Sequence, residues 1–217
     1  MNTDFLDIVT NKEKIQKELV FYSLFLMVFE NFVSFWMEQS RSFYANDFSL
    51  DEDRKKLICK FSKWNMENGE MKFVPDKEAE KKYIDEVLHT IKYKNGQWNP
   101  KMSLFHWMVG FGLIEKEEYF VLERCYELRN TYGHEIASCL ERYVTKEEKQ
   151  LLKKFIDIAK KASRNWILMI EIPANPDFSN SDFLDENGDY KEPDVYSGFD
   201  MFYSLVLMNL KEVFDEE

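Results

Sequence analysis

The first strong pattern in the chain is a long apolar stretch near its N-terminus. Residues 12–40 begin with charged side chains and then become apolar on every side of a helical projection. This pattern predicts one long helix buried in a bundle or an interface. Its segment Leu19–Met37 approaches the length of a membrane span. Because Glu30 and Asn31 interrupt that segment and aromatic residues outnumber aliphatic ones, we favour a buried helix over a membrane span.

A second helix is predicted to follow. Ser49 and Glu52 have the spacing of a capping box, in which a hydroxyl and a carboxylate satisfy free backbone amides at the start of a helix. The pattern predicts a helix from this box to about Trp64. The dipeptide Asn68-Gly69 is a turn signal and ends the region.

The next two helices are predicted from a cap and from apolar spacing. Asp76 is expected to cap a helix that runs to about Tyr93, with an apolar stripe at helical spacing along it. The dipeptide Asn95-Gly96 closes that helix. Residues Met102–Phe111 predict a further short helix, which the following glycines end in a turn between helices.

The C-terminal half contains the clearest helical patterns. One helix is predicted from about Glu115 to at least Leu128, and its apolar spacing allows it to continue to Tyr143. A capping box at Thr145–Glu148 then opens a helix that runs to about Glu171. Both helices carry an apolar stripe, which predicts that they pack in a common core.

The end of the chain combines an acidic loop with a last helix. Residues 172–198 are rich in proline and acids, which predicts a long loop, and residues 199–214 predict the final helix. Glycine and proline together number only 12, so tight turns are few and the chain should be nearly all-α. A length of 217 residues suits one domain, 1–217.

The net charge of −11 is unevenly distributed. Residues 172–200 hold eight acids against one lysine and the last three residues are all acidic, so the remaining body is close to neutral. Residues 141–164 carry a local excess of basic side chains. Such a helical face could follow a phosphate backbone, although a solvated surface is the commoner meaning of a charged face. The candidate RNA-binding residues on it are Arg142, Lys146, Lys149 and Lys153.

Cysteine spacing and the N-terminus bear on the cellular compartment. Cys59, Cys125 and Cys139 lie far apart without C-x-x-C spacing, which argues against a disulfide framework and against a zinc site. The first ten residues lack the pattern of a basic and then apolar signal peptide. We therefore expect a cytoplasmic protein without a metal or other cofactor and without a membrane partner.

The most informative chemistry lies in the string from Arg129 to His134, Arg-Asn-Thr-Tyr-Gly-His. Asn130 and His134 are four residues apart, so on a helix the amide could orient the imidazole. Arg129 and His134 are about 140° apart around an unbroken helix. They could act on one phosphate only if the helix bends, for which Gly133 is a candidate position, or if a second subunit supplies a group.

This string, in its helical context from Gly112 to Leu140, resembles the signature of the HEPN superfamily. That signature is an arginine, usually followed by a polar residue, with a histidine four to six residues later in a helical bundle. Residues from Gly112 to Asn130 are also similar to the mannitol-operon repressor branch. The resemblance covers about 30 residues and implies a HEPN-like antiparallel helical bundle, with its core at about 76–171 and an extra N-terminal helix pair.

The resemblance also implies roles for the motif residues. Family ribonucleases work without a metal, as homodimers whose motifs face each other. His134 would then be the general acid and base, Arg129 would stabilise charge on the phosphate, and Asn130 would position the histidine. The expected function is an endoribonuclease of toxin or phage-defence type. Its expected partners are RNA, a second copy and an antitoxin or regulator.

Two other functions remain open from the sequence. The first is a non-catalytic regulatory or interaction protein of the mannitol-repressor type, and the second is a plain helical scaffold. In the regulatory protein the same residues would stabilise a dimer. If the motif is purely structural, Arg129 would pair with an acid of the bundle and His134 would cap a neighbouring helix. The low isoelectric point, about 4.9, also disfavours a protein that must hold a polyanion.

Overall fold

The computed structural model describes residues 10–45, 47–50, 57–172 and 198–214. The described chain is mostly helical, as the sequence predicted. It also contains two small antiparallel sheets of two strands each, which the sequence pattern did not predict. Its contacts divide the chain into two compact units, which we describe separately. One comprises the residues up to Glu30 and those from Phe111 onward, and the other is Asn31–Gly110. The single domain over residues 1–217 stays a prediction.

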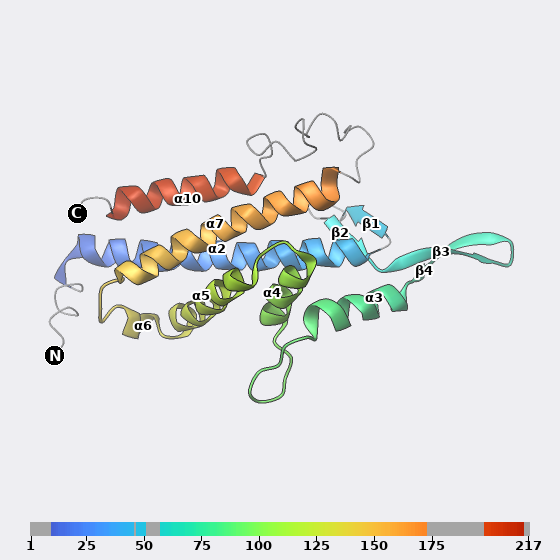
Figure 1. Cartoon of the computed structure of the whole chain (residues 1–217), viewed down its shortest axis with the longest axis horizontal. Coiled ribbons are helices and arrows are strands. Elements are labelled where there is room, and N and C mark those ends of the chain that lie inside the picture. Colours follow the sequence, from blue (N-terminus) through green and yellow to red (C-terminus); the bar gives the residue numbers. More distant parts are fainter. Residues whose placement is uncertain (1–9, 46, 51–56, 173–197, 215–217) are drawn as a thin grey trace. The chain divides into compact units, whose positions relative to one another are not determined.

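The first unit is built from helices. It contains the N-terminal part of α2 (Lys12–Tyr44), α5 (Lys116–His134), α6 (Ile136–Cys139), α7 (Lys146–Trp166) with a π-helical turn after it (Ile167–Glu171), and α10 (Gly198–Phe214). Helix α10 runs alongside α7 and packs against it (Figure 1). The long N-terminal helix, the helix after the Thr145 box and the final helix are therefore confirmed. Of the predicted acidic loop, residues 173–197 lie outside the described residues.

Aromatic side chains of α2, α5 and α7 form the core of the first unit. Tyr132 of α5 lies against Tyr22 and Phe25 of α2, with ring centroids 4.6 and 5.3 Å apart. Phe155 of α7 lies against Phe25 and Phe29, at 6.5 and 5.8 Å. All five side chains are buried. Phe25 and Phe29 are four residues apart and share a helix face, so α2 uses one apolar face to hold both α5 and α7.

Helix α2 also meets the length and hydropathy expected of a membrane span. Among the described residues, it is the one helix that does so. Core helices of globular proteins meet the same criterion, and less than half of its most apolar window is buried in the structure.

The second unit combines the rest of α2 with strands and shorter helices. These are β1 (Asp47–Leu50), β2 (Leu57–Lys60), β3 (Ser62–Glu67), β4 (Glu70–Pro75), α3 (Lys77–Tyr83) with a π-helical turn (Ile84–Leu88), and α4 (Pro100–Phe111), whose last residue belongs to the first unit. Phe32 of α2 packs on Phe105 of α4, with centroids 6.2 Å apart. The short helix predicted at 102–111 is confirmed as α4.

The helix predicted from the Ser49 box to about Trp64 is wrong. Ser49 lies in β1, which pairs with β2, and Trp64 lies in β3, which pairs with β4. Asn68 and Gly69 have φ of 54° and 83°, the left-handed values of a two-residue hairpin turn. Residues 64–67 and 70–73 alternate between apolar and polar side chains, and this period of two belongs to a strand. The turn and the alternation thus account for β3 and β4, whereas Ser49 lies in β1 because that segment pairs with β2, opposite Ile58.

The helix capped by Asp76 is confirmed at its start but is shorter than predicted. The Ala79 amide donates to Asp76 Oδ1 at 3.1 Å, which is the expected cap. The helix ends at Leu88 and not near Tyr93, because the Ser103 hydroxyl oxygen accepts hydrogen bonds from the amides of Thr90 and Ile91 at 3.2 and 2.9 Å. Residues 92–98 then form a small hairpin-like turn, closed by a bridge between its two ends.

Replacing Gly69 by alanine is expected to weaken the β3–β4 hairpin. No atom lies within 4 Å of an added Cβ, so the cost comes from the backbone φ of 83° alone, and it should be about 1–2 kcal/mol. Amide hydrogen exchange in β3 and β4 should accelerate about 5- to 30-fold. Gly110→Ala is the control, because Gly110 is helical with equally open space. Unchanged exchange in Gly69→Ala would contradict this account of the turn.

Candidate functional site

Helix α5 carries the predicted motif and is fixed at its start by acidic residues. The Glu115 amide donates to Glu118 Oε2 at 2.7 Å in a capping box. Lys161 of α7 places its ammonium 2.6 Å from Glu115 Oε1 and 3.1 Å from Glu118 Oε1. The hydrogen bond to Glu115, together with Glu118, raises the pKa of Lys161. The start of α5 is thereby tied to α7, which sets the orientation of the helix that ends at His134.

Arg129 lies in a polar contact with α2. Its Nε pairs with Glu30 Oε1, and its Nη1 donates to Asn130 Oδ1 at 3.2 Å. The two side chains of the ion pair are 26% and 44% exposed, so water screens it and it should contribute no more than about 1 kcal/mol. This contact matches the structural alternative drawn from the sequence, in which Arg129 pairs with an acid of the bundle.

His134 is the last residue of α5 and is exposed. The helix ends there because Glu135 leaves the helical conformation, with φ −127° and ψ 33°, while its amide still donates to the Thr131 carbonyl at 2.8 Å. The sequence allowed this helix to continue as far as Tyr143, but it ends at His134, and α6 follows as a separate short helix. An exposed imidazole at a helix end is accessible to a large substrate or to a second protein.

The motif residues are only partly brought together within one chain. Helix α5 remains helical through Gly133, so the bend considered there does not occur. Arg129 contacts α2, and the helical spacing leaves His134 about 140° away around the axis. Among the described residues, no hydrogen bond joins Asn130 to His134, and the Asn130 amide oxygen instead accepts from Arg129. A site that uses both Arg129 and His134 would thus need a group from elsewhere.

A partly buried polar cluster lies beside the motif and was not predicted. Arg142 binds Glu148 through two hydrogen bonds of 2.8 and 2.6 Å, and Thr145 donates to the same carboxylate from its amide and its hydroxyl. Glu18 of α2 accepts from the Val144 amide at 2.8 Å. These contacts fix the segment between α6 and α7 against α2. The capping box at Thr145 is confirmed, and its carboxylate also holds Arg142.

The pKa values of the two acids in this cluster are shifted in opposite directions. Burial alone would raise the pKa of Glu148, but the hydrogen bonds from Arg142 and Thr145 outweigh burial and hold this pKa below its usual value. Burial raises the pKa of Glu18, and the like charge of Glu148 raises it further. The backbone hydrogen bond from Val144 lowers this pKa but does not outweigh burial. Glu148 is thus held as a carboxylate, whereas the fold disfavours the charged form of Glu18.

The four candidate RNA-binding residues differ in their surroundings. Arg142 is committed to Glu148, so its guanidinium is already hydrogen-bonded. Lys146 and Lys153 on α7 are exposed, and Lys149 is half-buried near Glu18. A phosphate contact at these positions stays a prediction, and the lysines are better placed for one than Arg142.

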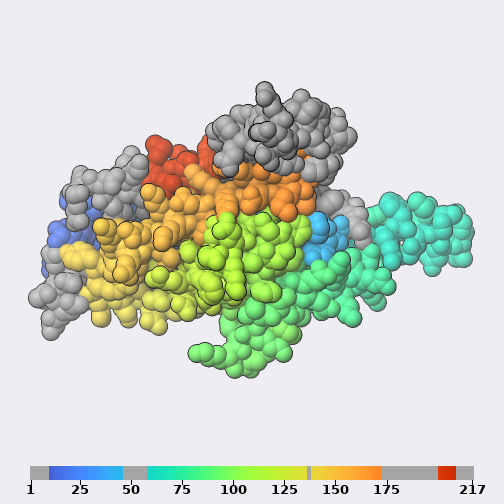
Figure 2. Space-filling model, viewed as in Figure 1, coloured from blue at the N-terminus to red at the C-terminus, as the bar shows by residue number. Residues whose placement is uncertain are grey.

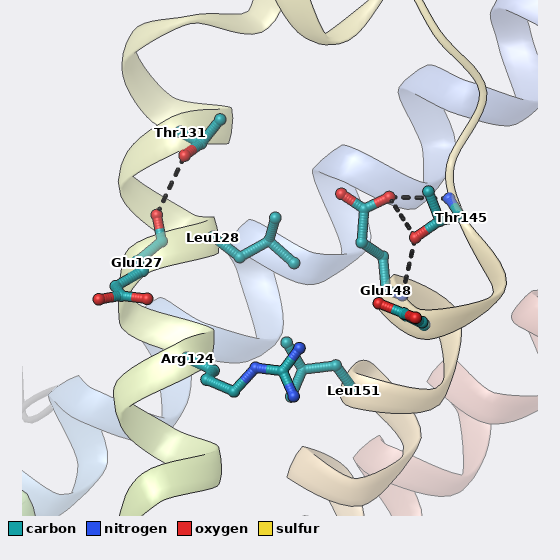
Figure 3. Close-up of a pocket in the computed structure, with 8 residues that line it drawn as sticks. Arg124, Glu127, Leu128, Thr131, Thr145, Glu148 and Leu151 are labelled. Atoms are coloured by element: carbon teal, nitrogen blue, oxygen red, sulfur yellow. Dashed lines mark hydrogen bonds between the residues drawn. The ribbon is translucent and has the colours of Figure 1, made fainter.

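A pocket of about 330 Å³ lies between α5 and the start of α7 (Figure 3). It is lined by Arg124, Glu127, Leu128, Thr131, Thr145, Glu147, Glu148 and Leu151. Its four α5 residues are three or four residues apart and therefore share one side of that helix. The lining includes one arginine and three glutamates, one of which is neutralised by Arg142, so the pocket suits a neutral or basic group better than a phosphate.

The pocket could have been found only in part from the sequence. The three- and four-residue spacing of its α5 residues is visible there, but the partner helix is not.

Among the described residues, no group of three or more histidine, cysteine or acidic side chains could hold a metal ion. Cys125 and Cys139 are buried free thiols, and burial raises the pKa of each.

Comparisons with models of known protein families, with curated proteins and with solved structures found no match to this chain. The likeness to the HEPN superfamily therefore rests on the motif and its helix alone.

Proposed function

We propose that this chain is a metal-independent endoribonuclease of toxin or phage-defence type that acts as a homodimer. The observation that carries the proposal is the exposed imidazole of His134 at the end of α5, five residues beyond Arg129. The helices of the first unit would form a HEPN-like bundle. In that case the bundle would be formed by α2, α5, α7 and α10. Residues 76–110, which were predicted as part of the core, lie in the second unit.

The proposed reaction is attack of a ribose 2′-hydroxyl on the adjacent phosphate. His134 of one copy removes the hydroxyl proton as the new P–O bond forms. Arg129 stabilises the negative charge that develops on the phosphate oxygens. The bond to the 5′-oxygen then breaks, and that oxygen takes a proton from a histidine. The products are a 2′,3′-cyclic phosphate and a free 5′-hydroxyl. Because the two side chains point apart on α5, a second copy is needed to complete the site.

The test is incubation of the purified chain with total RNA in EDTA. Cleavage that leaves 2′,3′-cyclic phosphate ends, identified by mass spectrometry of the fragments, is the expected result. No cleavage by a folded protein, with or without residues 176–198, would overturn the proposal. RNA and a second copy are then the direct partners, with an antitoxin or regulator as a further one.

A second candidate function is a non-catalytic regulatory protein, and the ion pair between Arg129 and Glu30 favours it. An arginine already paired with a carboxylate on a neighbouring helix performs a structural role without any substrate. In this case RNA would remain intact and the motif would support the bundle or a dimer interface.

Glu30→Gln separates the two functions. In the nuclease, the Glu30 carboxylate competes with phosphate for Arg129, so removal of its charge should raise kcat/KM for RNA about two- to fivefold, the free-energy range of an exposed ion pair. In a regulatory protein, the only effect would be a loss of stability of up to about 1 kcal/mol. Glu13→Gln, at an exposed acid near the start of the same helix, is the control. A fall in activity without unfolding would contradict the competition.

A further inference from the structure

The β3–β4 hairpin carries an unusual concentration of exposed apolar side chains. Trp64, Met66, Met71 and Phe73 are 60%, 68%, 61% and 39% exposed. They lie directly opposite one another across the two strands, Trp64 against Phe73 and Met66 against Met71. The two rings make an edge contact with centroids 4.4 Å apart. Side chains alternate along a strand, so all four project from one face, which we call the apolar face (residues 62, 64, 66, 71, 73 and 75).

The opposite face of the hairpin is mostly polar. It presents Lys63, Asn65, Glu67, Glu70, Lys72 and Val74, with an ion pair of 3.0 Å between Lys72 and Glu67. The apolar face, by contrast, has no charged residue. Tryptophan, phenylalanine and methionine are the types enriched in the buried centres of protein interfaces, and charges are depleted there. In the space-filling view no other segment covers the near side of the outer part of the turquoise hairpin (Figure 2), although Ser62 at its base is buried.

A two-stranded hairpin with one uncovered apolar face is marginally stable in water, which is a reason for it to be covered. With side chains of roughly 200 Å² each, the exposed fractions leave about 450 Å² on this face. Two such faces would bury about 900 Å², close to the roughly 1,000 Å² that separates specific interfaces from chance contacts. The area therefore suits a weak and reversible contact.

We propose that the apolar face of the hairpin packs against the same face of a second copy. The face is self-complementary, because an aromatic pair occupies one half and a methionine pair the other. A two-fold axis through its centre places the rings of Trp64 and Phe73 over Met66 and Met71 of the other copy. Sulfur–aromatic contacts favour that arrangement, and no charge is buried. The contact lies wholly within Asn31–Gly110, so it does not depend on the proposed nuclease motif.

Electrostatics gives the proposal a characteristic salt dependence. Each copy carries a net charge of −11, so two copies repel each other at low ionic strength. Salt screens that repulsion and leaves apolar contacts intact. Self-association should therefore strengthen as sodium chloride is added, opposite to the behaviour of a contact held by ion pairs.

The test compares two substitutions on opposite faces of β3 by sedimentation equilibrium. Trp64→Thr keeps a strand-forming residue but removes the ring, and it should raise the dissociation constant of self-association about tenfold or more. Asn65→Thr, its neighbour on the polar face, should leave the constant unchanged. Because the comparison is between variants, it holds whether the chain is otherwise a monomer or a dimer. Equal association in both variants overturns the proposal.

An unfolded hairpin in Trp64→Thr would also weaken self-association, so a second measurement uses the unaltered chain. With methionine methyl groups labelled by ¹³C, the signals of Met66 and Met71 should move upfield between micromolar and millimolar protein, since each methyl packs over a ring. Fixed signals over that range overturn the proposal. Trp64-dependent binding to phosphatidylcholine and phosphatidylserine vesicles, without such a shift, also overturns it and identifies a lipid surface as the cover.

Discussion

Replacement of His134 by alanine is expected to lower kcat/KM for RNA cleavage about 100- to 10,000-fold, the usual contribution of a general acid and base. The free energy of unfolding should change by no more than about 0.5 kcal/mol, because the side chain is exposed at the last position of α5. Rates with a defined oligoribonucleotide in EDTA measure the first quantity, and urea denaturation measures the second. Added imidazole should partly restore cleavage if the missing group acts by proton transfer.

His106→Ala is the matched control for this prediction. His106 is also an exposed histidine on a helix, α4, but it belongs to the second unit. Its loss should leave cleavage unchanged. If His134→Ala cleaves RNA as fast as His106→Ala does, the nuclease activity does not use the motif. If neither protein nor the unaltered chain cleaves RNA, the regulatory function becomes the better account.

Helix starts were predictable where a side chain and a backbone amide within a few residues decide the structure. The capping box at Thr145 and the helix cap at Asp76 form as expected. The same rule failed at Ser49, which pairs with Ile58 of β2 instead. It also failed at Trp64, where the Asn68-Gly69 turn joins β3 to β4. The end of the helix capped by Asp76 was also not predicted. The Ile91 amide donates a hydrogen bond to the hydroxyl of Ser103, which lies twelve residues further along the chain.

The candidate site was predictable only as a list of residue types. The motif itself is local, and the divergence of Arg129 and His134 follows from helix geometry. The partner of Arg129 does not, since Glu30 lies 99 residues earlier in the chain. Arg142 was predicted to face RNA because its region has a basic excess, yet its guanidinium binds Glu148. Charge counts along a sequence do not reveal which charges are already paired in the fold.

The largest structural effect is expected from the partly buried cluster beside the motif, at Glu148. Its carboxylate accepts hydrogen bonds from Arg142 and Thr145 and completes the capping box of α7. Its side chain is 11% exposed, whereas that of Arg142 is 39% exposed. Loss of the carboxylate therefore removes charge-assisted hydrogen bonds and a helix cap, although water can reach the arginine that remains.

Glu148→Ala should lower the free energy of unfolding by about 2–3 kcal/mol at neutral pH. This is below the cost of breaking a fully buried ion pair, because Arg142 is partly solvated. Glu147→Ala is the matched control, since Glu147 is the preceding residue in the same first helical turn but is exposed. It should cost less than about 1 kcal/mol, through the helix dipole alone. Equal losses in both variants would show that the Arg142 contact does not stabilise the fold.

The difference in unfolding free energy between the unaltered chain and Glu148→Ala should depend on pH with a definite sign. Because the pKa of Glu148 is lower in the folded chain than in the unfolded one, its stabilisation is fully present above the unfolded value. It is lost as the pH falls below about 4 toward the folded value. The gap between the unaltered chain and Glu148→Ala, measured by urea denaturation, should therefore narrow in acid. Protonation of Glu18, whose pKa is raised, also stabilises the fold in acid. Burial is the largest cause of that raise and is common to both proteins, whereas the smaller part due to the Glu148 charge is absent in Glu148→Ala and partly offsets the narrowing. A gap that stays constant between neutral pH and pH of about 3 would show that the carboxylate charge contributes nothing.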